Sequence, residues 1–321
     1  MAVIGEVQQP PQIPWRDRIR LAEAFRLGTE LQEQVWKGWS RPPFIVLLVT
    51  PEYEFLMRHP DPTEDFELVG FDPLIQSDIY FRERTFPTDS LAALPTIGQV
   101  STIVVGQAEN TVALISTPWV LAVLHEHFHL WQNSHQDFRD EADALGLAHG
   151  DKTGMWMLDF PFPYDDTEVA GVFSDLCQSL ANVLRGRQRP DFMSKLAVYL
   201  ESRKRFKSVL SSDDYNYFSF QVWMEGVAHY AEHRIAELAE EKFVPSKDFS
   251  SLRDFTPFRE AADSLNRRIS SGLTNTRLAR ARRVAFYSVG AAEAMLLDEV
   301  NPGWQEGYMK DKFFMERYFL K

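Results

Sequence analysis

Cysteine is nearly absent from this 321-residue chain, which has only Cys177. A single thiol cannot form a disulfide within the chain, and it cannot build a zinc site from cysteines. Long apolar runs are also missing, since no stretch approaches the roughly 20 residues of a membrane span. The opening segment MAVIGEVQQPPQIPW lacks the basic-then-apolar pattern of a secretion signal. These absences predict a soluble, cytoplasmic protein in which Cys177 is a buried, unreactive thiol.

Basic residues are outnumbered by acidic ones, so that the formal net charge is -12 and the pI about 5.2. Such a surface repels phosphate backbones and anionic lipids, and we therefore expect neither nucleic acid nor a membrane as a partner. The hydrophobic fraction of 45% and the charged fraction of 25% are ordinary for a globular protein. The length allows one large domain or two smaller ones, and the composition indicates no oligomeric state.

Predicted strands occupy the first third of the chain, and predicted helices occupy the rest. Apolar spacing predicts a helix over 15–39 that ends near Gly38. Turn-rich segments separate the predicted strands, which span 44–50, 67–71, 77–84, 99–105 and 111–116. Thr117-Pro118 is a helix-start signal. The helices that follow are predicted near 118–136, 167–186, 191–212, 214–242, 257–271, 276–299 and 302–316. Strands first and helices after indicate an α+β architecture.

The segment LAVLHEHFHLWQ (121–132) contains an H-E-x-x-H pattern formed by His125, Glu126 and His129. Residues four apart lie on one face of a helix, so both imidazoles can reach one ion. Glu126 lies one residue round the helix, close enough to contact a water on that ion. Two neutral imidazoles together with an oxygen ligand suit zinc. His127 points away from this face, and we assign it no ligand role.

A catalytic zinc site needs a third protein ligand and one open position. The best candidate lies in VWMEGVAHYAEHR (222–234), where Glu225, His229 and Glu232 share one helical stripe. Glu225 is the predicted third ligand. Glu232 is predicted to hold a ligand imidazole through its other nitrogen.

The segment E-G-V-A-H-Y-A-E (225–232) resembles the E-G-x-A-x-Y-x-E segment of gluzincin zinc metallopeptidases, in particular the aminopeptidase N and leukotriene A4 hydrolase type. In that family the first glutamate is the third zinc ligand, which implies the same role for Glu225. The family also has a Y-x-K-G segment later in the chain, whose tyrosine stabilises the oxyanion. Y-S-V-G (287–290) resembles it, which implies this role for Tyr287, with Val289 in place of the lysine.

A third segment, Gly106-Gln107-Ala108-Glu109-Asn110, resembles the G-x-M-E-N segment of the aminopeptidases. There the glutamate binds the free amino group of the substrate, which implies a substrate-binding role for Glu109. The gap between His129 and Glu225 is much longer than in the aminopeptidases, and residues 1–95 have no counterpart. The resemblance is therefore that of a divergent member or a sister family.

The resemblance implies a single zincin-like unit over 1–321, with a β-rich subdomain containing a small mixed sheet at 1–117 and a helical subdomain carrying the metal site at 118–321. It implies one Zn²⁺ per chain and a peptide or small peptide-like substrate. Glu126 would activate the zinc-bound water that attacks the carbonyl, and zinc and Tyr287 would hold the oxyanion. Aminopeptidase and endopeptidase activity both fit these residues.

Two other classes of function also fit parts of the sequence. A di-metal carboxylate helical-bundle oxidase needs two E-x-x-H pairs on different helices, and Glu126-x-x-His129 supplies only one. A zinc-binding protein without catalysis would keep the ligands and lose the other roles, yet every catalytic position is filled. The basic run RLARARR (277–283) is expected to be a solvated face or to pair with acidic neighbours.

Overall fold

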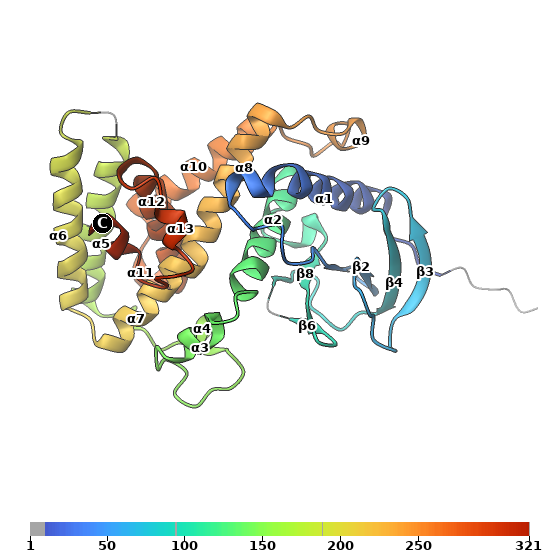
Figure 1. Ribbon diagram of the computed structural model, residues 1–321, viewed down its shortest axis with the longest axis horizontal. Helices are drawn as coiled ribbons and strands as arrows, with labels where there is room; N and C mark the ends of the chain where they lie inside the picture. Colours follow the sequence, from blue (N-terminus) through green and yellow to red (C-terminus); the bar gives the residue numbers. More distant parts are fainter. Residues whose placement is uncertain (1–9, 94, 188, 321) are drawn as a thin grey trace, which may run out of the picture. The chain divides into compact units, whose positions relative to one another are not determined.

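The computed structural model describes residues 10–93, 95–187 and 189–320, so the first nine residues of the opening segment lie outside this description. The chain divides into two compact units. Unit 1 comprises Met1–Trp131 and Leu238–Phe258, and unit 2 comprises Gln132–Glu237 and Arg259–Lys321. These boundaries differ from the predicted subdomains 1–117 and 118–321, because residues 118–131 and 238–258 belong to the first unit. An N-terminal mixed sheet and a helical C-terminal part confirm the predicted α+β class (Figure 1).

Unit 1 is built on a six-stranded sheet with the order β3-β4-β2-β1-β8-β5. Its strands are β1 (Val46–Val49), β2 (Tyr53–Met57), β3 (Glu67–Asp72), β4 (Ser77–Glu83), β5 (Leu91–Ala92) and β8 (Ile103–Gly106). β1 and β8 are parallel, and the other pairs are antiparallel. A separate hairpin joins β6 (Thr96–Ile97) to β7 (Val100–Ser101). Every residue of β1 and β8 is buried, which explains why these strands are continuously apolar.

Two long helices pack with this sheet in unit 1. The first, α1 (Trp15–Val35), ends because Trp36 takes an extended conformation, earlier than Gly38 predicts. The second, α2 (Ser116–Asn133), begins within two residues of the predicted start. Edge-to-face ring contacts link Phe25 to Phe44 and Trp36 to Phe128, with centroids 4.9 and 5.1 Å apart. The short helices η1 (Ala108–Asn110) and α9 (Lys247–Ser250) complete the unit.

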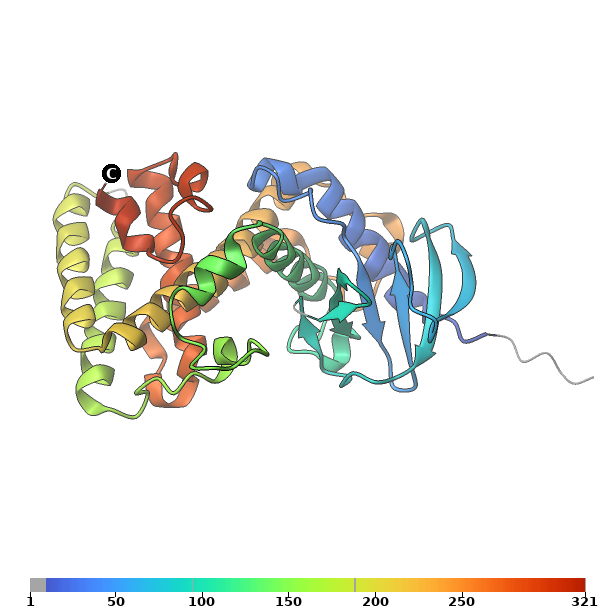
Figure 2. The ribbon, with the colours of Figure 1, turned by 60° about the horizontal axis from the view of Figure 1, so that its bottom comes forward.

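Unit 2 is helical in the part of the chain that the structure describes. Its elements are α3 (Phe138–Asp143), α4 (Trp156–Asp159), α5 (Thr167–Arg185), α6 (Phe192–Ser208), α7 (Ser212–Gln221), the π-helical turn η2 (Val222–Gly226), α8 (Val227–Lys242), α10 (Phe258–Asn275), α11 (Leu278–Ala281), η3 (Arg282–Val284), α12 (Ala285–Val300), α13 (Trp304–Gly307) and η4 (Met315–Leu320). α5 and α6 lie side by side (Figure 2). The last turns of α8 belong to unit 1.

Four phenylalanines form the centre of the helical unit. Phe173, Phe206, Phe218 and Phe286 come from α5, α6, α7 and α12, and neighbouring ring centroids lie 4.9–5.6 Å apart. Cys177 is buried one turn further along α5, and its burial raises the pKa of the thiol. The predicted burial of Cys177 is thus confirmed.

The structure interrupts two predicted helices: the one over 214–242 contains the π-helical turn η2, and the one over 276–299 is divided into α11, η3 and α12, with Arg282 at φ 49°. It contradicts two further predicted elements. Residues 111–116 form no strand, since the chain passes from η1 through a turn with Leu114 at φ 62° into α2. The predicted helix over 302–316 is reduced to α13 and η4, which are separated by a turn. β2 was not predicted, because the buried Glu54 interrupts its apolar pattern.

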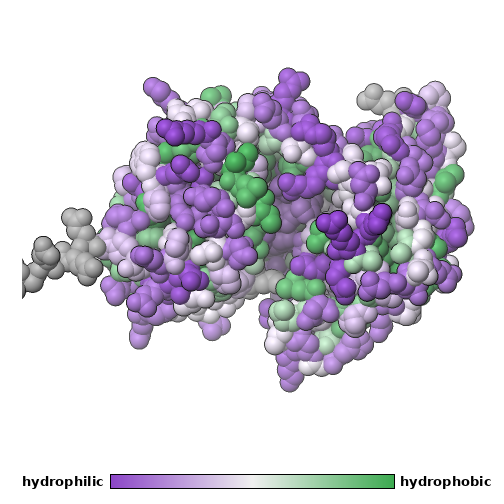
Figure 3. All heavy atoms as spheres, turned by 180° about the vertical axis from the view of Figure 1, so that it is seen from behind, coloured by the Kyte–Doolittle hydropathy of each residue, from purple (hydrophilic) through white to green (hydrophobic). Residues whose placement is uncertain are grey.

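Hydrophilic side chains cover most of the face displayed in Figure 3, and hydrophobic ones occur there in small groups. Within the described ranges, none of the helices combines the length and the apolar character needed to cross a bilayer.

A buried ion pair offers a test of the helical unit. Arg203 on α6 has its Nε 3.1 Å from Glu293 on α12 and its Nη2 3.3 Å from Glu316, and both Arg203 and Glu293 are almost fully buried. Burial raises the pKa of Glu293, although Arg203 opposes the rise. Arg203→Leu should destabilise the protein by about 3–5 kcal/mol, because it leaves a buried carboxylate without its cation. Urea unfolding at pH 7 measures this loss.

The control for this prediction is Arg203→Leu combined with Glu293→Leu. Removing both charges should restore much of the lost free energy of unfolding, because no uncompensated charge then remains in the core. Equal losses in the single and double variants would contradict the expected coupling.

Candidate metal centre

The helix that carries the H-E-x-x-H pattern is anchored at its N-terminus. Ser116 N–H donates to Asp254 Oδ2 at 3.1 Å, and the Thr117 hydroxyl donates to the Thr256 carbonyl at 2.7 Å. Trp119 Nε1 donates to the carbonyl oxygen of Gly106 at the end of β8, at 2.8 Å. A Cβ on Gly106 would lie 1.8 Å from the Thr88 carbonyl oxygen, so only glycine fits there. These contacts fix the start of α2 against the sheet.

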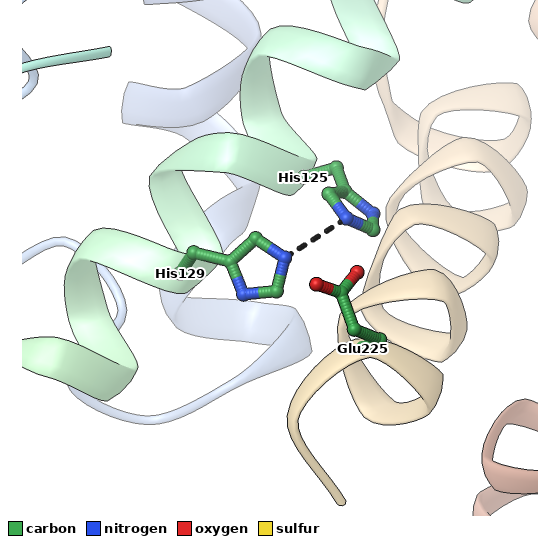
Figure 4. A group of neighbouring side chains, drawn as sticks. All are labelled: His125, His129 and Glu225. Atoms are coloured by element: carbon green, nitrogen blue, oxygen red, sulfur yellow. Dashed lines mark hydrogen bonds between the residues drawn. The ribbon is translucent and has the colours of Figure 1, made fainter. Parts of the chain in front are cut away.

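His125 and His129 lie one turn apart on α2 and face each other. Their Nε2 atoms are 3.1 Å apart, and both residues are buried, with 7% and 6% of their surface exposed. Two ligands of one tetrahedral zinc, at bond lengths near 2.05 Å, lie about 3.3 Å apart. The separation of the two imidazole nitrogens therefore fits a shared metal ion as well as the hydrogen bond between the rings that Figure 4 draws. Glu126 is also buried, beside His125 on the same helix.

His127 lies on another face of α2. Its Nδ1 is 2.6 Å from Gln32 Nε2, its Nε2 is 3.1 Å from the Pro42 carbonyl, and its ring stacks on Phe44 with centroids 4.2 Å apart. Burial lowers the pKa of His127 to about 4, although the Pro42 carbonyl opposes this. A neutral ring with these neighbours joins α1 to α2, and it has no part in either group of side chains that could hold a metal.

Glu225 lies in the π-helical turn η2, between α7 and α8. π-helical turns are rare and frequently occur at functional sites. Two side chains donate to carbonyls of this turn: Gln132 to Met224 at 3.0 Å, and Tyr308 to Trp223 at 2.7 Å. Gln132 is on α2, three residues after His129 and within the same compact unit as the turn. The end of α2 therefore lies against the turn that carries Glu225.

The structure brings three of the predicted ligands together. One ligand atom from each of His125, His129 and Glu225 lies within 4.8 Å of the others, and the carboxylate points toward the two imidazoles (Figure 4). The donor set is two imidazole nitrogens and one carboxylate oxygen, which is the ligand set of several zinc hydrolases. These residues could hold a zinc ion.

A second group shares His125 and adds His229 and Glu232, again within 4.8 Å. His229 Nδ1 lies 3.1 Å from Glu232 Oε2. The sequence assigns no role to His229, although its place on the stripe with Glu225 is visible there. Since one imidazole normally binds one ion, the two groups are alternative ligand sets for a single ion.

Tyr287 lies beside this second group. Its ring centroid is 5.4 Å from that of His229, and its hydroxyl accepts a hydrogen bond from Arg283. Arg283 belongs to the basic run that was expected to be solvated or paired with acidic neighbours. Arg277, Arg280 and Arg282 are exposed, and Arg282 lies 3.9 Å from Asp165, as expected. Arg283 is half-buried and contacts a phenolic oxygen instead.

Two glycines let α12 contact the π-helical turn directly. A Cβ on Gly290 would lie 2.1 Å from the Val222 carbonyl oxygen and 2.7 Å from Gly226 Cα, and a Cβ on Gly226 would lie 2.5 Å from Gly290 Cα. Gly226 follows Glu225, and Gly290 comes one turn after Tyr287. The two glycines therefore set the spacing between the elements that carry these side chains.

Gly290→Ala should separate α12 from the π-helical turn and shift Glu225. Overpacking of this kind costs about 1–3 kcal/mol, and we expect weaker zinc binding as well. Gly171→Ala on α5 is the matched control, since a Cβ there meets nothing within 4 Å and should leave metal binding unchanged. Thermal unfolding with and without zinc measures both effects, and a Gly290→Ala protein as stable as its parent would contradict the close packing.

Glu109 lies in η1, where its carboxylate contacts Arg20. Its Oε2 accepts from Arg20 Nη1 at 2.8 Å, and the side chain remains 47% exposed. Burial tends to raise the pKa of Glu109, but the hydrogen bond from Arg20, a backbone hydrogen bond and the charges of Arg20 and Arg16 together hold the pKa below its usual value. Arg20 is itself fully buried and also pairs with Asp17 and Asp254. Glu109 belongs to neither metal-ligand group.

Comparison with known proteins does not assign this chain to a family, so any assignment depends on the residues of this site and their spacing. No family model, no curated protein and no solved structure matches the chain.

Proposed function

We propose that this protein is a zinc-dependent hydrolase, specifically a zinc metallopeptidase of a divergent, zincin-like gluzincin type, with His125, His129 and Glu225 as the ligands. The observation that carries the proposal is the pair of buried Nε2 atoms 3.1 Å apart, with a Glu225 oxygen within 4.8 Å. Three protein ligands leave a fourth position for water or substrate, as in catalytic zinc sites.

The chemistry of the donor set favours a transition metal such as zinc over Ca²⁺ and Mg²⁺. Two imidazoles exclude the all-oxygen coordination that Ca²⁺ and Mg²⁺ prefer. Cys177 is buried on α5 and supplies no thiolate ligand. In this proposal Glu232, which has a carboxylate oxygen within 4.8 Å of a ring nitrogen of His125, holds that ligand imidazole through its second nitrogen and fixes its tautomer.

Zinc, when bound, would polarise a substrate carbonyl and lower the pKa of a water to about 7. Glu126 then acts as general base: its carboxylate takes a proton from the attacking water and passes it to the leaving amine. The hydroxyl of Tyr287 donates to the carbonyl oxygen as negative charge develops there. Arg283 orients that hydroxyl and makes it a stronger donor.

Tyr287→Phe should lower kcat for peptide cleavage by about 10²–10³-fold, the usual effect of removing one oxyanion donor. KM and zinc content should change little, because the hydroxyl acts in the transition state. Tyr53→Phe, on β2 of the other unit, serves as the control. Unchanged kcat in Tyr287→Phe would remove Tyr287 from the mechanism.

The proposal is tested by metal analysis of the purified protein and by a mixed peptide library. We expect one zinc per chain and cleavage that a chelator abolishes and zinc restores. Cleavage only beside free N-termini would support Glu109 as the amine anchor, whereas internal cleavage would identify an endopeptidase. Two irons per chain without zinc would refute the proposal in favour of a di-metal oxidase, and zinc without any cleavage would favour a binding role.

A further inference from the structure

Unit 2 contains a second concave site that none of the residues discussed above enters. It is a cavity of about 700 Å³ between the C-terminal end of α5 and the second half of α10. This volume is in the range of small-molecule sites. Its charged lining consists of Arg185, Arg187, Arg267 and Asp263.

Three guanidinium groups and one carboxylate give this lining a formal charge of 3 − 1 = +2, in a chain whose net charge is -12. Arg185 donates to Asn182 Oδ1 at 2.8 Å, and Arg187 donates to the Leu184 carbonyl at 3.3 Å. Within the described ranges, no ion pair joins Arg185, Arg187 or Arg267 to a carboxylate. The cavity therefore concentrates positive charge that the protein itself does not neutralise.

Helix electrostatics explain only part of this arrangement. Arg185 and Arg187 lie at the end of α5, where the negative end of the helix dipole favours cations. Arg267 lies in the middle of α10 and lines the same cavity, where no dipole effect requires it. Arginines from the end of α5, from the residues just after it and from α10 thus line one hollow, and guanidinium groups bind phosphate by paired hydrogen bonds.

We propose that this cavity binds the phosphate group of a small phosphorylated molecule. A phosphate monoester dianion neutralises the charge of +2. Hydroxyl and amide groups of the lining, from Asn266, Ser270 and Thr274, can bind a polar body such as a sugar. Leu184 and Leu273 supply an apolar wall. This site is separate from the proposed zinc centre and does not depend on it.

Calorimetry on the full chain tests the proposal, with chelator-treated protein so that phosphate cannot bind zinc. Ribose 5-phosphate should bind at least about tenfold more tightly than ribose, and tighter binding than inorganic phosphate would identify a phosphorylated metabolite rather than free phosphate as the ligand. Arg187→Gln combined with Arg267→Gln should weaken binding by at least tenfold. Arg268→Gln, the neighbouring arginine on α10 that does not line the cavity, should bind like the parent.

Three results would overturn the proposal. Ribose and ribose 5-phosphate could bind equally, phosphate could bind no more tightly than sulfate at equal ionic strength, or the double variant could match the parent. If the double variant fails to fold, Arg267→Gln alone replaces it, because this residue is exposed on α10. Zinc content and peptide cleavage are measured separately and are expected to be unchanged in all the arginine variants.

Discussion

Glu126→Gln should lower kcat for peptide cleavage by about 10²–10⁴-fold, the contribution expected of a general base. The amide has nearly the shape of the carboxylate but cannot accept the proton of the attacking water. Because Glu126 is not among the proposed ligands, the variant should still bind one zinc per chain. This combination of lost turnover and retained metal distinguishes a base from a ligand.

The measurement compares kcat, KM and zinc content in the parent, in Glu126→Gln and in Glu201→Gln. Glu201 is a matched glutamate on α6 whose side chain is 75% exposed, so its variant should behave like the parent. If Glu126→Gln retains zinc and cleaves peptides at the parental rate, the protein uses another base or is not a peptidase.

The sequence predicts the metal-binding helix well, because local physics determines it. The Thr117-Pro118 start signal and the apolar residues around His125 and His129 predict a helix over 118–136, and the structure has one over Ser116–Asn133. Once the helix exists, the spacing of four residues brings the two imidazoles onto one face. No information from distant parts of the chain is needed for this step.

The surroundings of Glu225 are a different case. The sequence predicts one continuous helix over 214–242, whereas the structure inserts a π-helical turn at Val222–Gly226. The carbonyls of that turn accept hydrogen bonds from Gln132 and Tyr308, which are far away along the chain. A change of helical pitch that depends on such distant donors leaves no local pattern, so sequence spacing alone could not predict it.

Buried charges hide other elements from pattern analysis. Glu54 is fully buried in β2, where it pairs with Arg82 at 2.7 Å and accepts from the backbone of Thr85. A charged residue at a buried strand position breaks the apolar pattern that predicts strands, and the compensating partners lie in a different part of the sequence. The contact between Arg283 and Tyr287 was not predicted either, because Arg283 was interpreted only as part of the basic run 277–283.

Glu225→Ala should remove most of the zinc affinity. The loss should exceed the 10–100-fold drop in metal affinity that follows substitution of a residue hydrogen-bonded to a ligand. A site left with two imidazoles has lost both a bond and the negative charge that offsets the cation. Zinc raises the melting temperature because it binds the folded protein. The increase on adding zinc should therefore disappear in this variant.

Variants of the second group decide which residues are the ligands, because the structure contains two triads that share His125. If His129 and Glu225 complete the set and Glu232 supports the His125 ring, Glu232→Ala should weaken zinc binding by about 10–100-fold. His229→Ala should have a smaller effect, because His229 contacts Glu232 rather than the metal. If His229 and Glu232 are the ligands instead, these two variants should lose zinc and Glu225→Ala should retain it. Competition with a zinc-binding dye measures all three affinities, and the order of their losses identifies the triad.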